Sequence, residues 1–321
     1  MKIILVWPTT KGARSGNGTT ARRWSGMLRA LGHDVQVQHE YQGEPVDLLI
    51  ALHAWRSRDA VLTFRQHWPH KPLIVALTGT DLYGFQYSHP QETGQSIQLA
   101  DVLIGLHDRV PLALPEAARP KVRIVYQSAT PRERQPPEKG VFEICVVGHL
   151  REEKDPLRAA WAVRELPEKS RIRVTQVGRA MSPEWEREAR EEMARNPRFK
   201  WRGEVDETAV ADLMARSRLM VISSRMEGGA NVVSEACRAG LPVIASYIDG
   251  NIGLLGEDYG GYYPVGDTAS LHDLLCMIEH EPFMLDKLRR QCLARAELFR
   301  PETEQAALAE ALDAAAHAVR A

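Results

Sequence analysis

The sequence predicts an α/β protein built from two domains, each with a doubly wound parallel sheet. Short apolar runs alternate with amphipathic stretches along the whole chain, a pattern typical of parallel sheets with helices on both faces. The chain has 321 residues, which is enough for two domains of ordinary size, each with its own core. We therefore expect two Rossmann-like domains, with ligands bound beyond the carboxyl ends of the strands.

The apolar runs give the expected strands in order. In the first half they cover residues 3–7, 35–37, 48–52, 73–77, 102–106 and 124–126, with a helix expected over 19–31. In the second half the apolar runs cover residues 142–147, 173–177, 199–201, 219–223 and 242–245. After residue 267 the pattern is helical, with breaks before Pro282 and Pro301.

A polar, proline-rich stretch at residues 130–140 separates the two halves and is interpreted as an interdomain linker. We place the boundary near residue 138, which gives a first domain of residues 1–137 and a second of residues 138–300.

Composition narrows the class of protein. Hydrophobic residues make up 44% and charged residues 26%, an ordinary globular balance, and a net charge of -1 argues against a nucleic-acid binder. Apolar runs are too short to span a bilayer, and the first residues lead straight into a strand instead of a signal peptide, so we expect a cytoplasmic location without stable membrane association. The cysteines are interpreted as reduced and structural: Cys145, Cys237, Cys276 and Cys292.

The most informative motif runs from Glu227 to Glu235. Glu227 ends an apolar run, glycines follow, and an amphipathic helix then begins, which predicts a strand, a tight turn and a helix N-terminus. Free N–H groups at a helix start suit a diphosphate or sugar hydroxyls, and each carboxylate can hold a vicinal diol. The predicted nucleotide-sugar site includes the residues in between: Gly228, Gly229, Ala230 and Asn231. Alternatively, Glu227 only complements the helix dipole and Glu235 lies on a solvated face.

A second motif, residues 148–156, follows the first strand of the second domain and precedes a helix. Lys154, with Arg151 nearby, would place fixed positive charge on a diphosphate and stabilise the charge that grows as the nucleotide leaves. The alternative is a solvated turn with internal ion pairs.

The first domain offers a further anion site after its first strand. Lys11, Arg14 and Arg22 surround a glycine-containing helix start, where we select these residues: Gly16, Asn17, Gly18, Thr19 and Thr20. A simple turn is the alternative, since such glycines are common. His53 and Thr78 each follow a strand of the same domain and are expected at the same sheet edge.

The spacing of Glu227 and Glu235, together with residues 239–246, resembles the donor-site signature of retaining glycosyltransferases of the family-4 type. This resemblance implies a GT-B fold, in which two Rossmann-like domains face a cleft and a last helix, about 301–321, packs onto the first domain. The family usually has arginine where this chain has His149, so either Arg151 or His149 can be the second phosphate contact. Many members have histidine where this chain has Thr78. An acceptor that arrives as an anion needs no general base and suits this replacement.

Several motifs are similar to one narrower family, the selenosugar synthases of selenoneine biosynthesis. The shared segments lie in both domains: residues 16–21, 51–54, 76–83, 126–129 and 147–157. The resemblance implies a C–Se bond-forming transfer of N-acetylglucosamine or glucose from a UDP-sugar to selenophosphate, with release of UDP and phosphate. A conventional family-4 glycosyltransferase acting on a lipid or sugar hydroxyl is one alternative, and a non-catalytic nucleotide-sugar-binding protein is another.

The resemblance also implies roles for the candidate residues. Glu235 would hold the ribose, and Glu227 with the backbone of residues 228–231 would hold the sugar and diphosphate. Lys154 with Arg151 would neutralise the leaving group, and Gly203, Glu204 and Val205 would lie near the uracil. Residues 16–20, His53 and Thr78 would line the acceptor side. We expect no cofactor and no metal, because the chain has no Asp-x-Asp pair where a metal-dependent transferase would need it.

Overall fold

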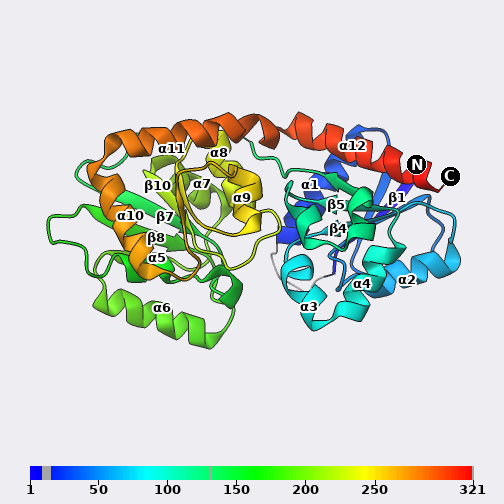
Figure 1. Cartoon of the computed structure of the whole chain (residues 1–321), viewed down its shortest axis with the longest axis horizontal. Coiled ribbons are helices and arrows are strands. Elements are labelled where there is room, and N and C mark those ends of the chain that lie inside the picture. The colour runs from blue at the N-terminus through cyan, green and yellow to red at the C-terminus, as the bar shows by residue number, and fades with distance from the viewer. Residues whose placement is uncertain (9–15, 131, 320–321) are drawn as a thin grey trace. The chain divides into compact units, whose positions relative to one another are not determined.

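The computed structural model describes the whole chain except residues 9–15, 131 and 320–321. Contacts divide the chain into two compact units. The first comprises Met1–Ser128, Glu227–Asn231 and Arg300–Ala321, and the second comprises Ala129–Met226 and Val232–Phe299. Each unit holds a parallel sheet flanked by helices (Figure 1).

The sheet of the first unit has the strand order β2-β1-β3-β4-β5-β6, and all neighbouring strands are parallel. Successive side chains along each strand point to opposite faces of the sheet, as strand geometry requires. The strands are β1 (Lys2–Val6), β2 (Asp34–Gln38), β3 (Leu48–Leu52), β4 (Leu73–Leu77), β5 (Val102–Gly105) and β6 (Val122–Ile124).

Two apolar layers cover this sheet. Ile4 and Leu49 face one layer, together with Phe64 of a helix, and Ile3 and Leu5 face the other. Burying each such side chain contributes about 1.5–3 kcal/mol. The helices and helical turns are α1 (Gly16–Ala30), α2 (Arg58–His67), η1 (Asp81–Phe85), α3 (Gln86–Ser88), α4 (Pro90–Leu99), η2 (Val110–Ala113), η3 (Glu116–Lys121) and α12 (Pro301–Ala318).

Helix α12 brings the last part of the chain onto the first unit. It begins at Pro301, whose missing N–H costs nothing at a first helical position. Leu308 and Leu312 are buried in the same layer as Trp24 of α1. The red helix packs against α1, β4 and β5 (Figure 1).

The sheet of the second unit has the order β12-β11-β10-β7-β8-β9 and is also parallel. Its strands are β7 (Phe142–Val147), β8 (Ile172–Val177), β9 (Phe199–Trp201), β10 (Leu219–Ile222), β11 (Val243–Ser246) and β12 (Tyr262–Tyr263). The helices and helical turns are η4 (Glu152–Lys154), α5 (Arg158–Ala162), α6 (Pro183–Arg195), α7 (Glu207–Arg216), α8 (Asn231–Ala239), α9 (Asp249–Leu255), α10 (Thr268–His280), α11 (Pro282–Arg295) and η5 (Ala296–Phe299).

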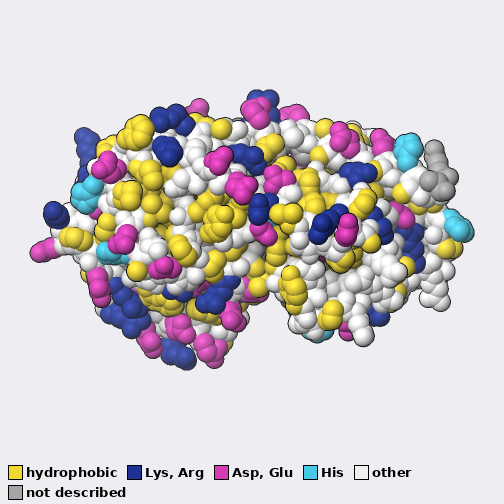
Figure 2. All heavy atoms as spheres, in the orientation of Figure 1, with side chains coloured by type: hydrophobic (Ala, Val, Ile, Leu, Met, Phe, Trp, Pro, Cys, Tyr) yellow, Lys and Arg dark blue, Asp and Glu magenta, His cyan; other side chains and the backbone are white. Residues whose placement is uncertain are grey.

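Helix α6 is the most highly charged helix surface of the second unit. Its arginines and glutamates form a mixed dark blue and magenta area (Figure 2). Arg190 Nη2 lies 2.7 Å from Glu186 Oε1, one helical turn away. Such exposed pairs contribute only tenths of a kcal/mol and mark an ordinary solvated face.

The predicted fold class is confirmed. Several strand bounds differ from the prediction by one residue, and three larger details differ as well. The strand expected at residues 124–126 is β6, Val122–Ile124, because its partner β5 ends at Gly105, opposite Ile124. Helix α1 begins at Gly16 instead of residue 19, so the glycine segment forms its first turn. The strand β12 was not predicted, because two residues carry no periodic signal.

Candidate functional site

The strand orders show where each sheet can hold a ligand. Open parallel sheets bind ligands beyond the carboxyl ends of the strands where the strand order reverses. The reversal lies between β1 and β3 in the first sheet, and between β7 and β10 in the second. His53 follows β3, and Gly148 follows β7. Several of the predicted residues therefore follow strands at a reversal point.

His53 is held tightly at the end of β3. Its side chain is almost fully buried, and its backbone has a φ of +78°, a left-handed conformation that is uncommon for residues other than glycine. Nδ1 accepts the backbone N–H of Arg56 (3.2 Å), so in the neutral ring the proton is on Nε2, which donates to Thr80 Oγ1 (3.0 Å). Burial lowers the pKa of His53, and the nearby Asp81 carboxylate partly opposes this effect. His53 is therefore a neutral histidine with both ring nitrogens engaged.

The segment Glu227–Asn231 is grouped by its contacts with the first unit. A Cβ added to Gly228 would lie 2.3 Å from the carbonyl carbon of Thr78, and one added to Gly79 would lie 2.5 Å from Gly228 N. These backbones approach so closely that both positions need glycine. Thr78 and Glu227–Gly228, which were predicted separately, are thus brought together. Glu227 is largely buried.

Gln127 connects this segment to the start of α1 and was not predicted. With its amide group oriented to satisfy both partners, its nitrogen donates to the Gly229 carbonyl (2.6 Å) and its oxygen accepts from Thr20 Oγ1 (2.5 Å). Arg23 Nη1 donates to Asn231 Oδ1 (3.2 Å). Gln127 is almost fully buried, so these bonds fix the predicted residues Gly229 and Thr20 with respect to each other.

The other residues of the first turn of α1 differ in their surroundings. A Cβ on Gly18 would lie 2.9 Å from the Trp7 ring, whereas one on Gly16 would meet no atom within 4 Å among the described residues. Thr19 accepts a hydrogen bond from Arg22 (3.3 Å), and Asn17 is half-buried. Two cations predicted beside this turn, Lys11 and Arg14, lie outside the described residues.

In the second unit, the loop after β7 is packed against the loop after β8. A Cβ on Gly178 would lie 2.0 Å from the Gly148 carbonyl oxygen, and the φ of Gly178 is +142°. His149 Nδ1 accepts the backbone N–H of Arg179 (3.1 Å). A neutral His149 therefore carries its proton on Nε2, as a donor. The signal for Gly178 was missed, because a close backbone approach has no sequence period.

The cations of this loop sit on a tight turn. Lys154 ends the turn η4 and is followed by Asp155, whose φ is +43°. Ser223 Oγ donates to the Asp155 carbonyl (2.8 Å), which ties this loop to the end of β10. Arg151 Nε lies 3.9 Å from Glu153 Oε2, and this buried nitrogen has no hydrogen-bond partner among the residues that the structure describes. The loop therefore presents two half-buried cations at the carboxyl edge of the sheet.

The last predicted donor residues lie at two other places of the second unit. Gly203 follows β9 with a φ of +70°, and its carbonyl accepts the N–H of Gly178 (2.8 Å). Glu204 is exposed and Val205 is half-buried. Glu235 is half-buried in the second turn of α8.

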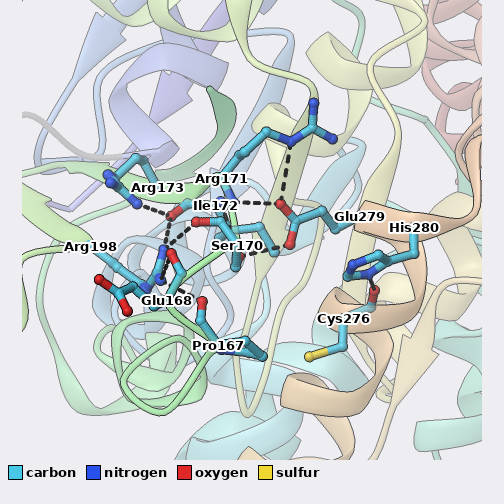
Figure 3. Close-up of polar contacts among 10 residues, drawn as sticks. All are labelled: Pro167, Glu168, Ser170, Arg171, Ile172, Arg173, Arg198, Cys276, Glu279 and His280. Atoms are coloured by element: carbon cyan, nitrogen blue, oxygen red, sulfur yellow. Dashed lines mark hydrogen bonds and ion pairs between the residues drawn. The ribbon is translucent and has the colours of Figure 1, made fainter. Parts of the chain in front are cut away.

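A separate polar cluster lies at the opposite, amino end of β8 (Figure 3). Glu279 accepts hydrogen bonds from Ser170 Oγ (2.7 Å) and from the Arg171 N–H (2.6 Å), and Arg198 Nη1 donates to the Ser170 carbonyl (2.8 Å). The bonds join α10 to the sheet and satisfy backbone groups there. Because ligands bind at the carboxyl ends of parallel strands, this cluster is structural.

Metal-binding clusters and membrane-spanning helices are both absent from the residues that the structure describes. No group of three or more His, Cys, Asp or Glu residues in that part of the chain has an arrangement that could hold a metal ion. Within the same residues, the helices are too short or too polar to cross a membrane.

The family described as glycosyl transferases group 1 matches residues 128–298, which is more than half of the chain. The chain therefore belongs to this family and is a transferase. No match is found among curated protein sequences.

Solved structures with the same fold include glycosyltransferases. Anabaena Alr3699/HepE in complex with UDP has a TM-score of 0.78 and 16% identity, and the match covers 98% of this chain and 100% of that one. Sucrose-phosphate synthase from Thermosynechococcus elongatus has a TM-score of 0.78 and 17% identity, with 96% and 97% covered. The lipopolysaccharide outer core galactosyltransferase WaaB has a TM-score of 0.71 and 12% identity, with 98% and 99% covered. The fold is therefore that of GT-B glycosyltransferases.

Proposed function

We propose that the protein transfers N-acetylglucosamine or glucose from a UDP-sugar to selenophosphate, and releases a 1-selenosugar, UDP and phosphate. The observation that carries the acceptor assignment is which side chains lie at the sheet edge around Thr78 and how they are hydrogen-bonded. Thr78 stands where many family members have a histidine, and the neighbouring His53 has both ring nitrogens engaged. A nucleophile that arrives ionised needs no proton acceptor at this edge.

A UDP-sugar as donor is supported by the fold neighbours. HepE was solved with UDP, with UDP and glucose, and with UDP-glucose. In the proposed complex Glu235 holds the ribose hydroxyls, and Glu227 with the backbone N–H groups of residues 228–231 holds the sugar and diphosphate. Residues 203–205 lie near the uracil.

The leaving group needs positive charge, because UDP departs with additional negative charge. Lys154 supplies a fixed cation, and Arg151 supplies a second one. The buried Nε of Arg151 has no hydrogen-bond acceptor among the described residues. His149 contributes its Nε2–H, since its Nδ1 is occupied by Arg179. We therefore assign both Arg151 and His149 to the diphosphate. No metal is needed in this scheme.

The reaction balances in two steps. A selenium lone pair of selenophosphate attacks the anomeric carbon, the C–Se bond forms, and the bond from that carbon to the UDP oxygen breaks. Water then attacks phosphorus, the Se–P bond breaks with its electron pair on selenium, and phosphate leaves. Residues 16–20, His53 and Thr78 line the acceptor side, where backbone N–H groups of the α1 start suit an oxyanion.

The test incubates purified protein with UDP-N-acetylglucosamine or UDP-glucose and enzymatically made selenophosphate. Mass spectrometry follows the selenium isotope pattern, and a coupled assay follows UDP release. Inorganic phosphate in place of selenophosphate is the matched control and should give no product. Absence of a selenosugar, or equal UDP release with a sugar or lipid hydroxyl acceptor, would refute the proposal in favour of a conventional glycosyltransferase. Binding of UDP without turnover of any donor would instead indicate a non-catalytic protein.

A further inference from the structure

We propose that Asp81 is a positioning residue for acceptor binding. Its carboxylate joins the turn after β3 to the loop after β4, and thereby sets the places of His53 and Thr78. The inference rests on the proposed function in one respect, namely that these two residues line the acceptor side.

Asp81 has hydrogen-bond partners from both loops. Its side chain is completely buried. Oδ2 accepts the N–H of Ala54 (2.8 Å), which follows His53 in the turn after β3. Oδ1 serves the other loop and accepts three backbone N–H groups, those of Thr78 (2.9 Å), Gly79 (2.8 Å) and Leu82 (3.1 Å).

This arrangement is more than a local turn. A carboxylate that caps only its own loop would use N–H groups nearby in sequence, as Oδ1 does here. Oδ2 instead reaches a residue that precedes it by 27 positions, on a different strand connection. The charge-assisted bonds offset the cost of burying the carboxylate, so the side chain is held in one orientation.

The turn after β3 depends on such a restraint because it contains a strained residue. His53 has a left-handed backbone with a φ of +78°, which persists only when the surroundings enforce it. Its N–H donates to the Ala76 carbonyl (2.8 Å) on one side, and Asp81 fixes Ala54 on the other. The ring is then fixed through Thr80 Oγ1. Asp81 therefore acts on the acceptor edge through His53.

The same carboxylate sets the second loop. Gly79 has a φ of +117° and lies against the backbone of Gly228. Asp81 holds the N–H groups of Thr78 and Gly79 on one side of this loop. A shift of the carboxylate would move Thr78 as well as Gly79. The loop begins a π-helical turn, η1, a geometry often found near functional sites.

The substitution Asp81→Asn tests the two loops separately, because it should disturb the turn after β3 and leave the loop after β4 intact. An asparagine has one carbonyl oxygen, which can keep the three N–H partners of Oδ1, while its NH2 group would then face the N–H of Ala54. The turn after β3 would lose its acceptor, and the loop after β4 would keep its own. We expect amide exchange in a peptide that contains Ala54 to accelerate about tenfold or more, since a buried N–H left without an acceptor is costly.

Asp101→Asn is the matched control in the same sheet. Asp101 Oδ2 accepts the N–H of Leu73 (2.8 Å) and forms an ion pair with Arg65 Nη2 (2.6 Å). Leu73 begins β4, so this carboxylate also accepts a backbone N–H, but at the amino edge of the sheet, away from His53 and Thr78. Its exchange effect should appear around Leu73 only.

The deciding measurement is the Michaelis constants for donor and acceptor. In Asp81→Asn the acceptor KM should rise about tenfold while the donor KM stays within about twofold, as expected for lost acceptor positioning. Asp101→Asn should leave both constants within about twofold. An unchanged acceptor KM in Asp81→Asn, or equal changes in both constants, overturns the inference and leaves Asp81 a purely structural residue.

A second variant, Thr80→Val, keeps the inference testable if Asp81→Asn does not fold. Thr80→Val keeps the size of the side chain but removes the acceptor of His53 Nε2, while Asp81 keeps its partners. It should raise the acceptor KM without faster exchange at Thr78. An unchanged acceptor KM in this variant also counts against positioning through His53.

Failure of the proposed function has a different signature. If the wild-type enzyme transfers sugar to a hydroxyl acceptor and not to selenophosphate, the selenium proposal fails. The same variants are then compared with the hydroxyl acceptor. In that case the Asp81 inference fails if the split between the acceptor and donor constants is absent with the hydroxyl acceptor too.

Discussion

Replacement of Glu304 by glutamine should destabilise the first unit strongly. Glu304 of α12 is completely buried, and its carboxylate binds groups from two other segments. Arg23 Nε donates to it at 2.8 Å and 3.1 Å, Trp24 Nε1 at 2.8 Å, and the N–H of Ser128 at 2.8 Å. Glutamine would keep one acceptor oxygen and would turn an NH2 group toward donors.

The size of the effect follows from these contacts. The arginine side chain is only 19% exposed, so the change leaves a poorly hydrated cation without its carboxylate. Breaking such a pair by removing one partner costs about 3–5 kcal/mol. For a unit of this size, that corresponds to a lower melting temperature by roughly 6–20 °C, at about 2–4 °C per kcal/mol.

Urea unfolding, followed by circular dichroism and tryptophan fluorescence, gives the loss in unfolding free energy. Glu302→Gln is the control, because Glu302 is exposed in the first turn of the same helix. It should cost no more than about 1 kcal/mol, the usual helix-dipole contribution. If the two variants unfold at the same urea concentration, Glu304 does not hold α12 to the unit and the reasoning fails.

Three further predictions concern the second unit. Gly178→Ala should prevent native packing of the loop after β7, because the added Cβ would lie 2.0 Å from the Gly148 carbonyl oxygen; thermal unfolding and UDP calorimetry should both show the loss. Glu235→Ala should raise the donor KM about tenfold or more if this carboxylate holds the ribose, as steady-state kinetics would show. Glu192→Gln should destabilise at neutral pH and much less in acid, measured as the difference in melting temperature across pH. Burial opposes ionisation of Glu192, but hydrogen bonds from Arg164 and its neighbours prevail and lower its pKa. That stabilisation is present above the unfolded pKa and is lost as pH falls through the folded one.

Each of these has a control or a contrary result. Gly140→Ala also places a side chain at a positive φ, +78° compared with +142° at Gly178, but no atom of the described residues lies within 4 Å of the added Cβ, so it should cost only strain; equal losses in both glycine variants would exclude the steric argument. An unchanged donor KM in Glu235→Ala would contradict the ribose role. Glu191→Gln alters an exposed neighbour, and its melting temperature should differ from that of the wild type by the same amount at every pH. For Glu192→Gln, a loss in melting temperature that persists in acid would contradict the predicted pH dependence.

The sequence was sufficient for every strand except the two-residue β12, and for the places of the motifs that follow the strands. Buried parallel strands such as Leu48–Leu52 and Leu73–Leu77 are continuous apolar runs, and their bounds matched the prediction. The fold followed from the alternation of these runs with helical stretches. The role implied for Glu235 rests on family resemblance, and kinetics must test it.

Residues that act through tertiary contacts escaped prediction. Asp81 lay within a predicted motif, but nothing in its neighbours shows that Oδ2 reaches Ala54. Gln127 bonds to residues more than a hundred positions away in both directions, and Gly178 matters because Gly148 comes close to it. Local sequence patterns encode period, capping and turns, whereas these contacts exist only after the sheets have formed.

The two units differ in the chemistry that they present, and this difference supports the proposed reaction. In the second unit the loop after β7 carries Lys154 and Arg151, the cations that stabilise the departing diphosphate in the proposed reaction. In the first unit, the side chains of His53 and Asp81 are engaged by backbone and hydroxyl partners. If His53 or Asp81 took the proton of a hydroxyl acceptor, either would have to break native hydrogen bonds to do so. An anionic acceptor makes no such demand, because its lone pair is available on arrival and the main electrostatic task is to neutralise the leaving group.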